Sequence, residues 1–129
     1  MVAVDTNVLV RLVVADHAAQ AARAAAVFRA GPVLIAKSVL LEAEWVLRYS
    51  YQLGADAILR SLRAVLGLEN VSVEDPKAIT AALRLFERGL DFADALHIAS
   101  SEQAERFVTF DARLAKRARR ASTLEVAVA

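Results

Sequence analysis

The stretch "VAVDTNVLVRL", residues 2–12, decides the fold. Residues 2–4 form a short apolar run that predicts a buried strand, and the polar residues Asp5, Thr6 and Asn7 end it. Apolar residues then return in a helical pattern over residues 7–14. A strand that leads directly into a helix is the first half of a βαβ unit, so this stretch predicts parallel strands.

The same alternation of apolar runs and longer helical patterns continues along the chain. It favours a parallel sheet covered by helices on both faces, an α/β sandwich that forms one domain over residues 1–129. Further strands are expected at residues 33–36, 71–73, 107–110 and 124–128. Further helices are expected at residues 17–29, 38–52 with Ser38 as cap, 55–66, 76–88, 91–105 and 112–120. Ligands of such sheets bind beyond the carboxyl ends of the strands.

The composition narrows the class of protein. The 129 residues are 57% hydrophobic, enough for a substantial core and for an interface with a subunit or partner. No run approaches the roughly 18 apolar residues of a membrane helix, and Asp5 comes too early for a signal peptide. The chain has no cysteine, which excludes disulfides, thiolate metal sites and cysteine nucleophiles. We therefore expect a cytoplasmic protein that does not bind membranes.

Four acidic residues lie at strand ends or near helix starts. Asp5 follows the first strand and Asp111 follows "FVTF", while Glu42 lies in "SVLLEAEWVLR" and Asp94 in "GLDFADALHIA". Each has a simpler explanation, because Asp and Glu also cap helices or complement the helix dipole in the first turn. Two rivals lie close by: Glu44 would project on a different side of the helix from Glu42, and Asp91 could be the cap in front of Asp94.

Capping does not explain why the acids recur at strand ends that share one edge of a sheet. Carboxylates brought together there raise one another's pKa and destabilise the fold unless a cation lies among them. Oxygen ligands without cysteine indicate Mg²⁺ or Mn²⁺, and such ions activate water for attack on phosphate. Two other acidic sites fit poorly: a haloacid-dehalogenase-type phosphatase needs an acid where Asn7 stands, and a receiver domain needs a lysine where Asp111 stands.

Four stretches in order resemble the PIN-domain ribonucleases, most closely the toxin subunit of VapBC-type toxin–antitoxin pairs. They are "VAVDTNVLVR", "SVLLEAEWVLRYSYQLG", "DFADALHIASS" and "FVTFDARLAK". The resemblance implies a three-layer, Rossmann-like α/β/α sandwich and Mg²⁺-dependent or Mn²⁺-dependent hydrolysis of RNA. It also implies that Asp5, Glu42, Asp94 and Asp111 surround the metal ion. Asp5 and Asp94 would be the direct ligands with Asp111 next, and Glu42 would act through water or as a base.

The resemblance extends to residues around this quartet and to partners. Thr6, Asn7 and Thr109 match polar positions that support the site, and Asp91 would be a cap or a supporting acid. Arg11 matches a position near the site, although it could equally pair with an acid. A cognate antitoxin and a second copy of the chain are the implied protein partners. Two alternatives share the fold: a non-catalytic PIN-like binding module, and a PIN nuclease of RNA processing that is not a toxin.

A basic stretch near the end is the candidate for RNA contact. No acid lies between Asp111 and Glu125, so the pattern fits either a solvated helix face or a contact with the phosphate backbone. Without the acidic quartet, 16 basic side chains stand against 11 acidic ones, a balance that would attract RNA. The basic residues of this stretch are Arg113, Lys116, Arg117, Arg119 and Arg120.

Aromatic residues and one histidine have two interpretations each. Trp45, Tyr49 and Tyr51 interleave with Arg48, which suits base stacking or packing in a core or subunit contact. The family resemblance favours packing in a dimer or against the antitoxin. His97 lies one turn after Asp94 and is expected to be an ordinary core or surface histidine, with a ligand role as the alternative.

Overall fold

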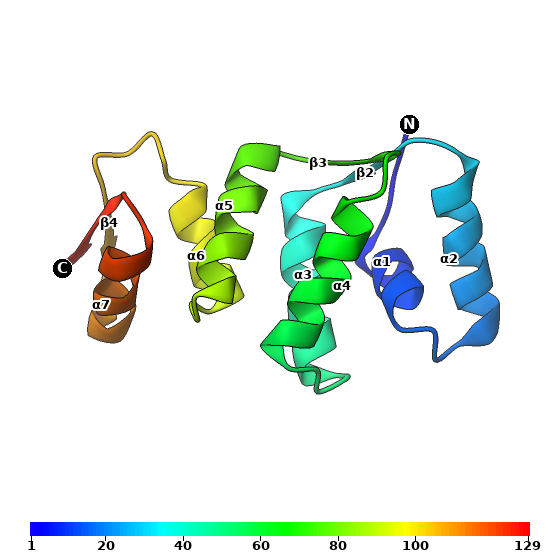
Figure 1. Cartoon of the computed structure of the whole chain (residues 1–129), viewed down its shortest axis with the longest axis horizontal. Helices are drawn as coiled ribbons and strands as arrows, with labels where there is room; N and C mark the ends of the chain where they lie inside the picture. The colour runs from blue at the N-terminus through cyan, green and yellow to red at the C-terminus, as the bar shows by residue number, and fades with distance from the viewer. The chain divides into compact units, whose positions relative to one another are not determined.

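The computed structural model describes residues 1–129 and contains two compact units, residues 1–76 and 77–129 (Figure 1). Each unit combines helices with strands that pair in parallel. The α/β class with parallel strands, predicted from the sequence, is therefore confirmed. The strands lie in one sheet of three strands and one of two.

Unit 1 is built from two successive crossovers. Its elements are β1 (Val2–Ala3), α1 (Thr6–Val13), α2 (Ala18–Ala30), β2 (Val33–Ile35), α3 (Lys37–Tyr49), α4 (Ala55–Leu66) and β3 (Val71–Val73). The strand order is β1-β2-β3, with Val2 opposite Val33 and Leu34 opposite Ser72. Because all three strands run in parallel, Asp5 and α3 both follow the carboxyl end of a strand.

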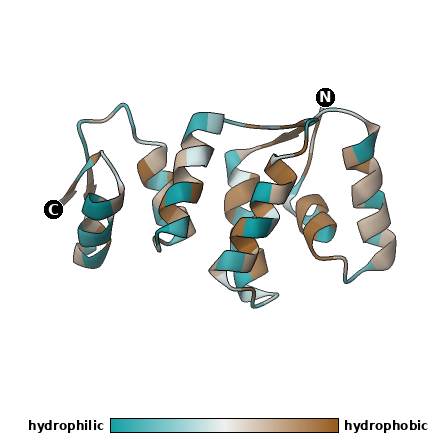
Figure 2. Cartoon of the chain, in the orientation of Figure 1, coloured by the Kyte–Doolittle hydropathy of each residue, from teal (hydrophilic) through white to brown (hydrophobic).

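The core of unit 1 lies among its helices. α1 packs against α2 and α3, and α3 packs against α4. Hydrophobic and hydrophilic residues alternate along α4 with helical spacing, which buries Ile58 and Leu62 completely (Figure 2). The Asn70 side chain donates to the backbone carbonyls of Phe28 and Gly31, so the start of β3 is tied to the end of α2.

Unit 2 has a helical pair and a small parallel sheet. Its elements are α5 (Pro76–Glu87, of which Pro76 ends the first unit), α6 (Phe92–Ala99), β4 (Arg106–Thr109), α7 (Ala112–Ala121) and β5 (Glu125–Val128). β4 pairs with β5, and α7 packs on both strands. The Phe86 and Phe92 rings meet edge to face, with centroids 5.4 Å apart.

The turn after α5 needs a glycine. Gly89 has a φ of 102°, a left-handed conformation that side chains other than glycine rarely adopt. Its N–H donates to the carbonyl of Phe86, and the Leu90 N–H donates to that of Leu85, which is the Schellman pattern. This turn sends the chain from α5 into the start of α6, where Asp91 and Asp94 lie.

Most element boundaries lie within one residue of the sequence prediction, and three predicted features are wrong. Ser38 does not cap α3: the N-cap position is Ala36, and the Glu74 side chain instead accepts a hydrogen bond from the Lys37 N–H at 2.9 Å. α3 ends at Tyr49 rather than at residue 52, where Gln52 takes a positive φ. α6 ends at Ala99 rather than at residue 105, because residues 100–103 offer no apolar side chain to pack and the Ser101 hydroxyl bonds the His97 carbonyl. None of the helices combines the length and apolar character that crossing a membrane requires.

Candidate metal and nucleic-acid site

In unit 1, Asp5 and Glu42 differ in how their carboxylates are used. Asp5 is the N-cap of α1, and its Oδ1 accepts a hydrogen bond from the Thr6 N–H at 2.8 Å. Asp5 therefore caps a helix, as the simpler explanation predicts. The capping hydrogen bond occupies only one of its two carboxylate oxygens. Glu42 is exposed on α3 and its side chain forms no hydrogen bond or ion pair. Both residues thus keep oxygen atoms that a ligand can use.

The structure separates Glu42 from its rival two residues away. Glu44 is only 1% exposed, and its two carboxylate oxygens accept hydrogen bonds from Arg48 Nε and Nη2 at 2.8 and 3.1 Å. A carboxylate that is buried and already paired with a guanidinium group is a poor metal ligand, because an ion would have to displace its partner and enter the core. Of these two residues, Glu42 is therefore the one that suits a metal site. Glu44 instead forms an ion pair with Arg48 within α3.

The supporting residues next to Asp5 have distinct environments. Thr6 is buried directly behind Asp5, whereas Asn7 is exposed and lines a cavity of about 330 Å³ between α1 and α2. Arg11 lines the same cavity and donates hydrogen bonds to Gln20 Oε1 at 2.7 Å and to the Tyr51 hydroxyl. It also lies 3.4 Å from Asp16, so the alternative that Arg11 pairs with an acid is confirmed.

In unit 2, two of the three candidate acids cap helices and the third does not. Asp91 caps α6 by accepting from the Asp94 N–H at 3.2 Å. Asp111 caps α7, because its Oδ1 accepts from the Arg113 and Leu114 N–H groups at 2.9 and 3.0 Å, which leaves Oδ2 unbonded. The Thr109 hydroxyl accepts from the Asp111 N–H at 3.0 Å and so supports this cap. The Asp94 side chain is half-buried and accepts no hydrogen bond.

The surroundings of Asp94 disfavour its charged form. Burial raises the pKa of its carboxyl above the ordinary value of 3.8, and the charges of Asp91 and Asp111 raise it further. His97, exposed one turn along α6, opposes this rise. Since Asp91 and Asp111 both act on the pKa of Asp94, the three acids share one electrostatic environment that a bound cation would stabilise.

This shift predicts how stability depends on pH. A folded-state pKa above 3.8 means that the protonated carboxyl favours the folded state below about pH 4, and that this stabilisation is lost as pH rises through the folded pKa. Asp94→Asn, which stays neutral, should therefore be more stable than the wild type at neutral pH without metal. Urea denaturation in EDTA should show the difference growing as pH rises from about 4 through the folded-state pKa, and a constant difference would contradict the assignment.

The donor atoms of the quartet suit a hard divalent cation. Each of Asp5, Glu42, Asp94 and Asp111 has at least one carboxylate oxygen without a hydrogen bond, and carboxylate oxygens are preferred ligands of Mg²⁺ and Mn²⁺. Neither unit by itself brings together three His, Asp or Glu side chains that could hold a metal ion. Asp5 and Glu42 belong to unit 1, and Asp94 and Asp111 belong to unit 2.

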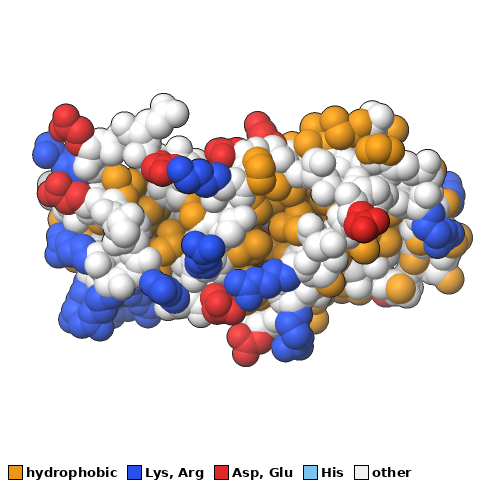
Figure 3. Space-filling model, turned by 45° about the horizontal axis from the view of Figure 1, so that its top comes forward, with side chains coloured by type: hydrophobic (Ala, Val, Ile, Leu, Met, Phe, Trp, Pro, Cys, Tyr) orange, Lys and Arg blue, Asp and Glu red, His pale blue; other side chains and the backbone are white.

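The basic stretch lies on α7, the helix that Asp111 caps. Arg117 and Arg119 are anchored to the carbonyls of Gly89 and Val126, at 3.1 and 3.0 Å. The side chains of Arg113, Lys116 and Arg120 are exposed and form no hydrogen bond or ion pair. Their spacing of three and four residues places them on one face of α7, and Figure 3 shows basic side chains gathered at this end of unit 2. Contact of these residues with RNA stays a prediction.

The aromatic residues of α3 lie on its surface. Trp45 and Tyr49 are 53% and 58% exposed, and their ring centroids are 4.9 Å apart. The Arg48 guanidinium lies 4.8 Å from the centre of the Tyr49 ring. Trp45 and Tyr49 are therefore not part of the core. Two interpretations remain for them: contact with another protein chain, or stacking on RNA bases.

One comparison with known proteins identifies the family of the chain. The family model for the PIN domain matches residues 2–120, a range that spans both units. A search of curated proteins found no match.

Proposed function

The chain belongs to the PIN-domain family, and from this premise we propose that it is a metal-dependent ribonuclease and the toxin of a VapBC-type toxin–antitoxin pair. PIN domains are generally nucleases and typically use divalent metals, so the family indicates a nuclease-like hydrolase. The observation that carries the proposal is the state of the acidic quartet. The four positions that the family resemblance assigns to the metal site are all acids, and each keeps a carboxylate oxygen free of hydrogen bonds.

The proposed roles are those that the family resemblance assigns, and the contacts within each unit are compatible with them. Asp5, Asp94 and Asp111 would hold Mg²⁺ or Mn²⁺, with Thr109 supporting Asp111. When bound, the ion stabilises the charge that develops on the phosphate during hydrolysis. The unpaired Glu42 would accept a proton from the attacking water, a role that needs a carboxylate without a competing hydrogen bond. The exposed cations of α7 would bind RNA phosphates next to Asp111.

One observation favours the alternative of a non-catalytic binding module. Asp5, Asp91 and Asp111 all cap helices, so these acids would have a structural use without any metal. Glu42 and Asp94 argue against this alternative, because neither is a cap and the pKa of Asp94 is raised. Asp94 lies in the first turn of α6, where the helix dipole favours its charge, so a raised pKa at this position is the feature that points to chemistry.

The proposed partners follow from the family resemblance and from exposed residues. Trp45 and Tyr49 are the large aromatic residues that α3 leaves exposed, and aromatic residues are enriched in protein interfaces. We propose that they contact a second copy of the chain or the cognate antitoxin. An RNA substrate would place the reaction in the cytoplasm.

RNA hydrolysis tests the proposed function. The purified chain should cleave labelled RNA in Mg²⁺ or Mn²⁺, and EDTA should abolish cleavage because no residue of the chain is proposed to act without the ion. RNA that binds but stays intact in both metals would favour the binding module instead. Expression in cells separates a toxin from a processing nuclease: growth arrest that co-expression of an antitoxin relieves is expected only for the toxin.

A further inference from the structure

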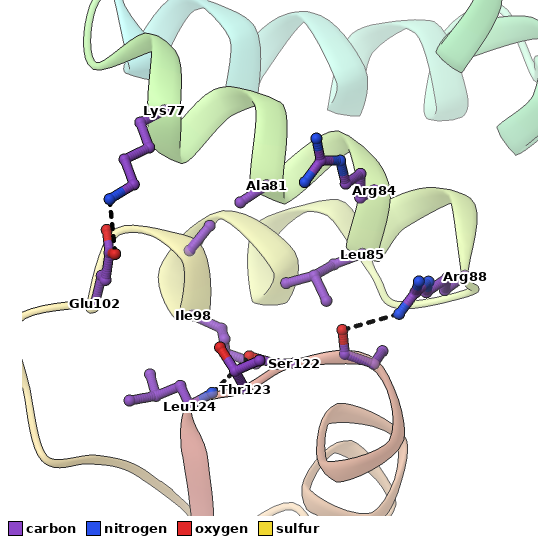
Figure 4. Close-up of a pocket in the computed structure, with 12 residues that line it drawn as sticks. Lys77, Ala81, Arg84, Leu85, Arg88, Ile98, Glu102, Ser122, Thr123 and Leu124 are labelled. Carbon is purple, nitrogen blue, oxygen red and sulfur yellow. Dashed lines mark hydrogen bonds and ion pairs between the residues drawn. The ribbon is translucent and has the colours of Figure 1, made fainter.

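Unit 2 contains a cavity of about 410 Å³ that belongs to none of the candidate acids. It is enclosed by α5, α6 and the segment at residues 121–124 that joins α7 to β5 (Figure 4). Leu85, Ile98 and Leu124 give it an apolar floor. Its volume lies in the range of small-molecule sites, which also combine an apolar lining with a few polar groups.

The polar groups of this cavity leave it positively charged. Lys77 is paired with Glu102 at 2.9 Å, so these two charges largely cancel. Arg84 lies on α5 and Arg88 lies four residues later, in the turn that follows the helix, and no second acid lines the cavity to balance them. Arg88 donates one hydrogen bond to the Ala121 carbonyl at 3.2 Å, whereas the Arg84 side chain forms no hydrogen bond or ion pair. An anion would therefore find a charge partner here.

The segment to which Arg88 bonds also brings two hydroxyl groups to the cavity. Figure 4 shows Leu85 and Ile98 pointing toward the segment that carries Ser122 and Thr123. The Ser122 hydroxyl oxygen accepts a hydrogen bond from the Leu124 N–H at 3.1 Å and keeps its own O–H to donate. Thr123 is exposed at the rim. The cavity thus offers cations, an apolar surface and hydroxyl groups within one small volume.

We propose that this cavity binds a nucleoside monophosphate unit. The phosphate would lie at Arg84 and Arg88, since guanidinium groups bind phosphate oxygens in pairs, and the base would lie on the apolar floor. The Ser122 and Thr123 hydroxyls would face the sugar. The unit could be a free mononucleotide or one nucleotide of an RNA strand; only the second source rests on the proposed function. An acidic peptide fits less well, because its charges are spread along an extended chain rather than set beside one planar ring.

Binding measurements on the full chain test this proposal, with EDTA present so that no hydrolysis occurs. Adenosine 5′-monophosphate, adenosine and a short RNA serve as probes in titration calorimetry. Arg84→Gln should weaken adenosine 5′-monophosphate binding about tenfold or more, through loss of a charge-assisted contact. Thr123→Glu, which adds a negative charge at the rim, should weaken it at least as much. Arg60→Gln, at an exposed position on α4, is the matched control and should leave binding unchanged.

The outcomes separate the two sources and expose a wrong assignment. Competition between RNA and adenosine 5′-monophosphate supports an RNA nucleotide as occupant, and mononucleotide binding without competition supports a free nucleotide. Both replaced positions are exposed, so unchanged unfolding midpoints should show that the variants fold. The proposal is overturned if adenosine 5′-monophosphate and RNA bind no better than adenosine, if Arg84→Gln has no effect, or if only an acidic peptide binds. RNA cleavage in Mg²⁺ is read separately, so its absence would refute the nuclease and not this cavity.

Discussion

Asp94→Asn should lower the rate of Mg²⁺-dependent RNA hydrolysis by more than about 100-fold. Loss of a group that merely orients a metal ligand costs about 10–100-fold, so loss of a direct ligand should cost more. The Asp94 carboxylate has no hydrogen bond to lose, and Asn has nearly its shape, so the fold should survive. Initial rates at saturating Mg²⁺ measure the effect.

The matched control for this variant is Glu105→Gln. Glu105 also belongs to unit 2, but it is exposed, forms no hydrogen bond or ion pair and lies outside the acidic quartet. Its replacement removes the same charge and should leave the rate within about twofold, equivalent to about 0.4 kcal/mol. An Asp94→Asn variant as active as Glu105→Gln would show that Asp94 takes no part in the reaction.

Arg48→Met should lower the free energy of unfolding by about 3 kcal/mol. This change leaves the Glu44 carboxylate, which is 1% exposed, without the bidentate partner that satisfies both of its oxygens. An exposed ion pair contributes far less to the free energy of unfolding. A loss of this size would therefore show that the Glu44 carboxylate is buried. Urea denaturation of the two proteins gives the difference.

A double-mutant cycle distinguishes the pair from loss of the long Arg48 side chain. Adding Glu44→Leu to Arg48→Met removes the stranded charge and should recover most of the lost stability. Arg60→Met on the exposed face of α4 is the control, with an expected effect within about 0.5 kcal/mol. A coupling energy below about 1 kcal/mol would mean that Glu44 and Arg48 behave as an ordinary surface pair.

Much of the secondary structure could be predicted because local signals were strong. The helix at Ala55–Leu66 has the predicted bounds because Gly54 and Gly67 flank it. The strand at Val71–Val73 also has the predicted bounds, because it is a short run with β-branched valines. The wrong boundaries arise where local propensity is not supported by packing. Residues 100–105 have helical composition, but α6 ends at Ala99 because none of these six residues is buried.

The candidate site was only partly predictable. Helical spacing places Glu42 and Glu44 on different sides of α3, but only packing decides which side is buried, and that depends on distant residues of unit 1. The sequence allows both helix capping and metal binding for Asp5 and Asp111. The structure shows that a cap uses one carboxylate oxygen and leaves the other, so the two roles are compatible. The cavity of unit 2 combines segments distant in the chain and has no sequence signature.

Thermal unfolding with and without Mn²⁺ tests the central claim most directly, using the wild type, Asp5→Asn and Asp94→Asn. Asn caps helices about as well as Asp, so Asp5→Asn preserves the cap of α1 while removing the charge. Mn²⁺ at about 100 times its dissociation constant should stabilise the wild type by about 2.7 kcal/mol, or about 8 °C in the midpoint, and should shift neither variant. A wild-type midpoint that Mn²⁺ leaves unchanged, or variants that shift as far as the wild type, would show that these acids only cap and pack helices.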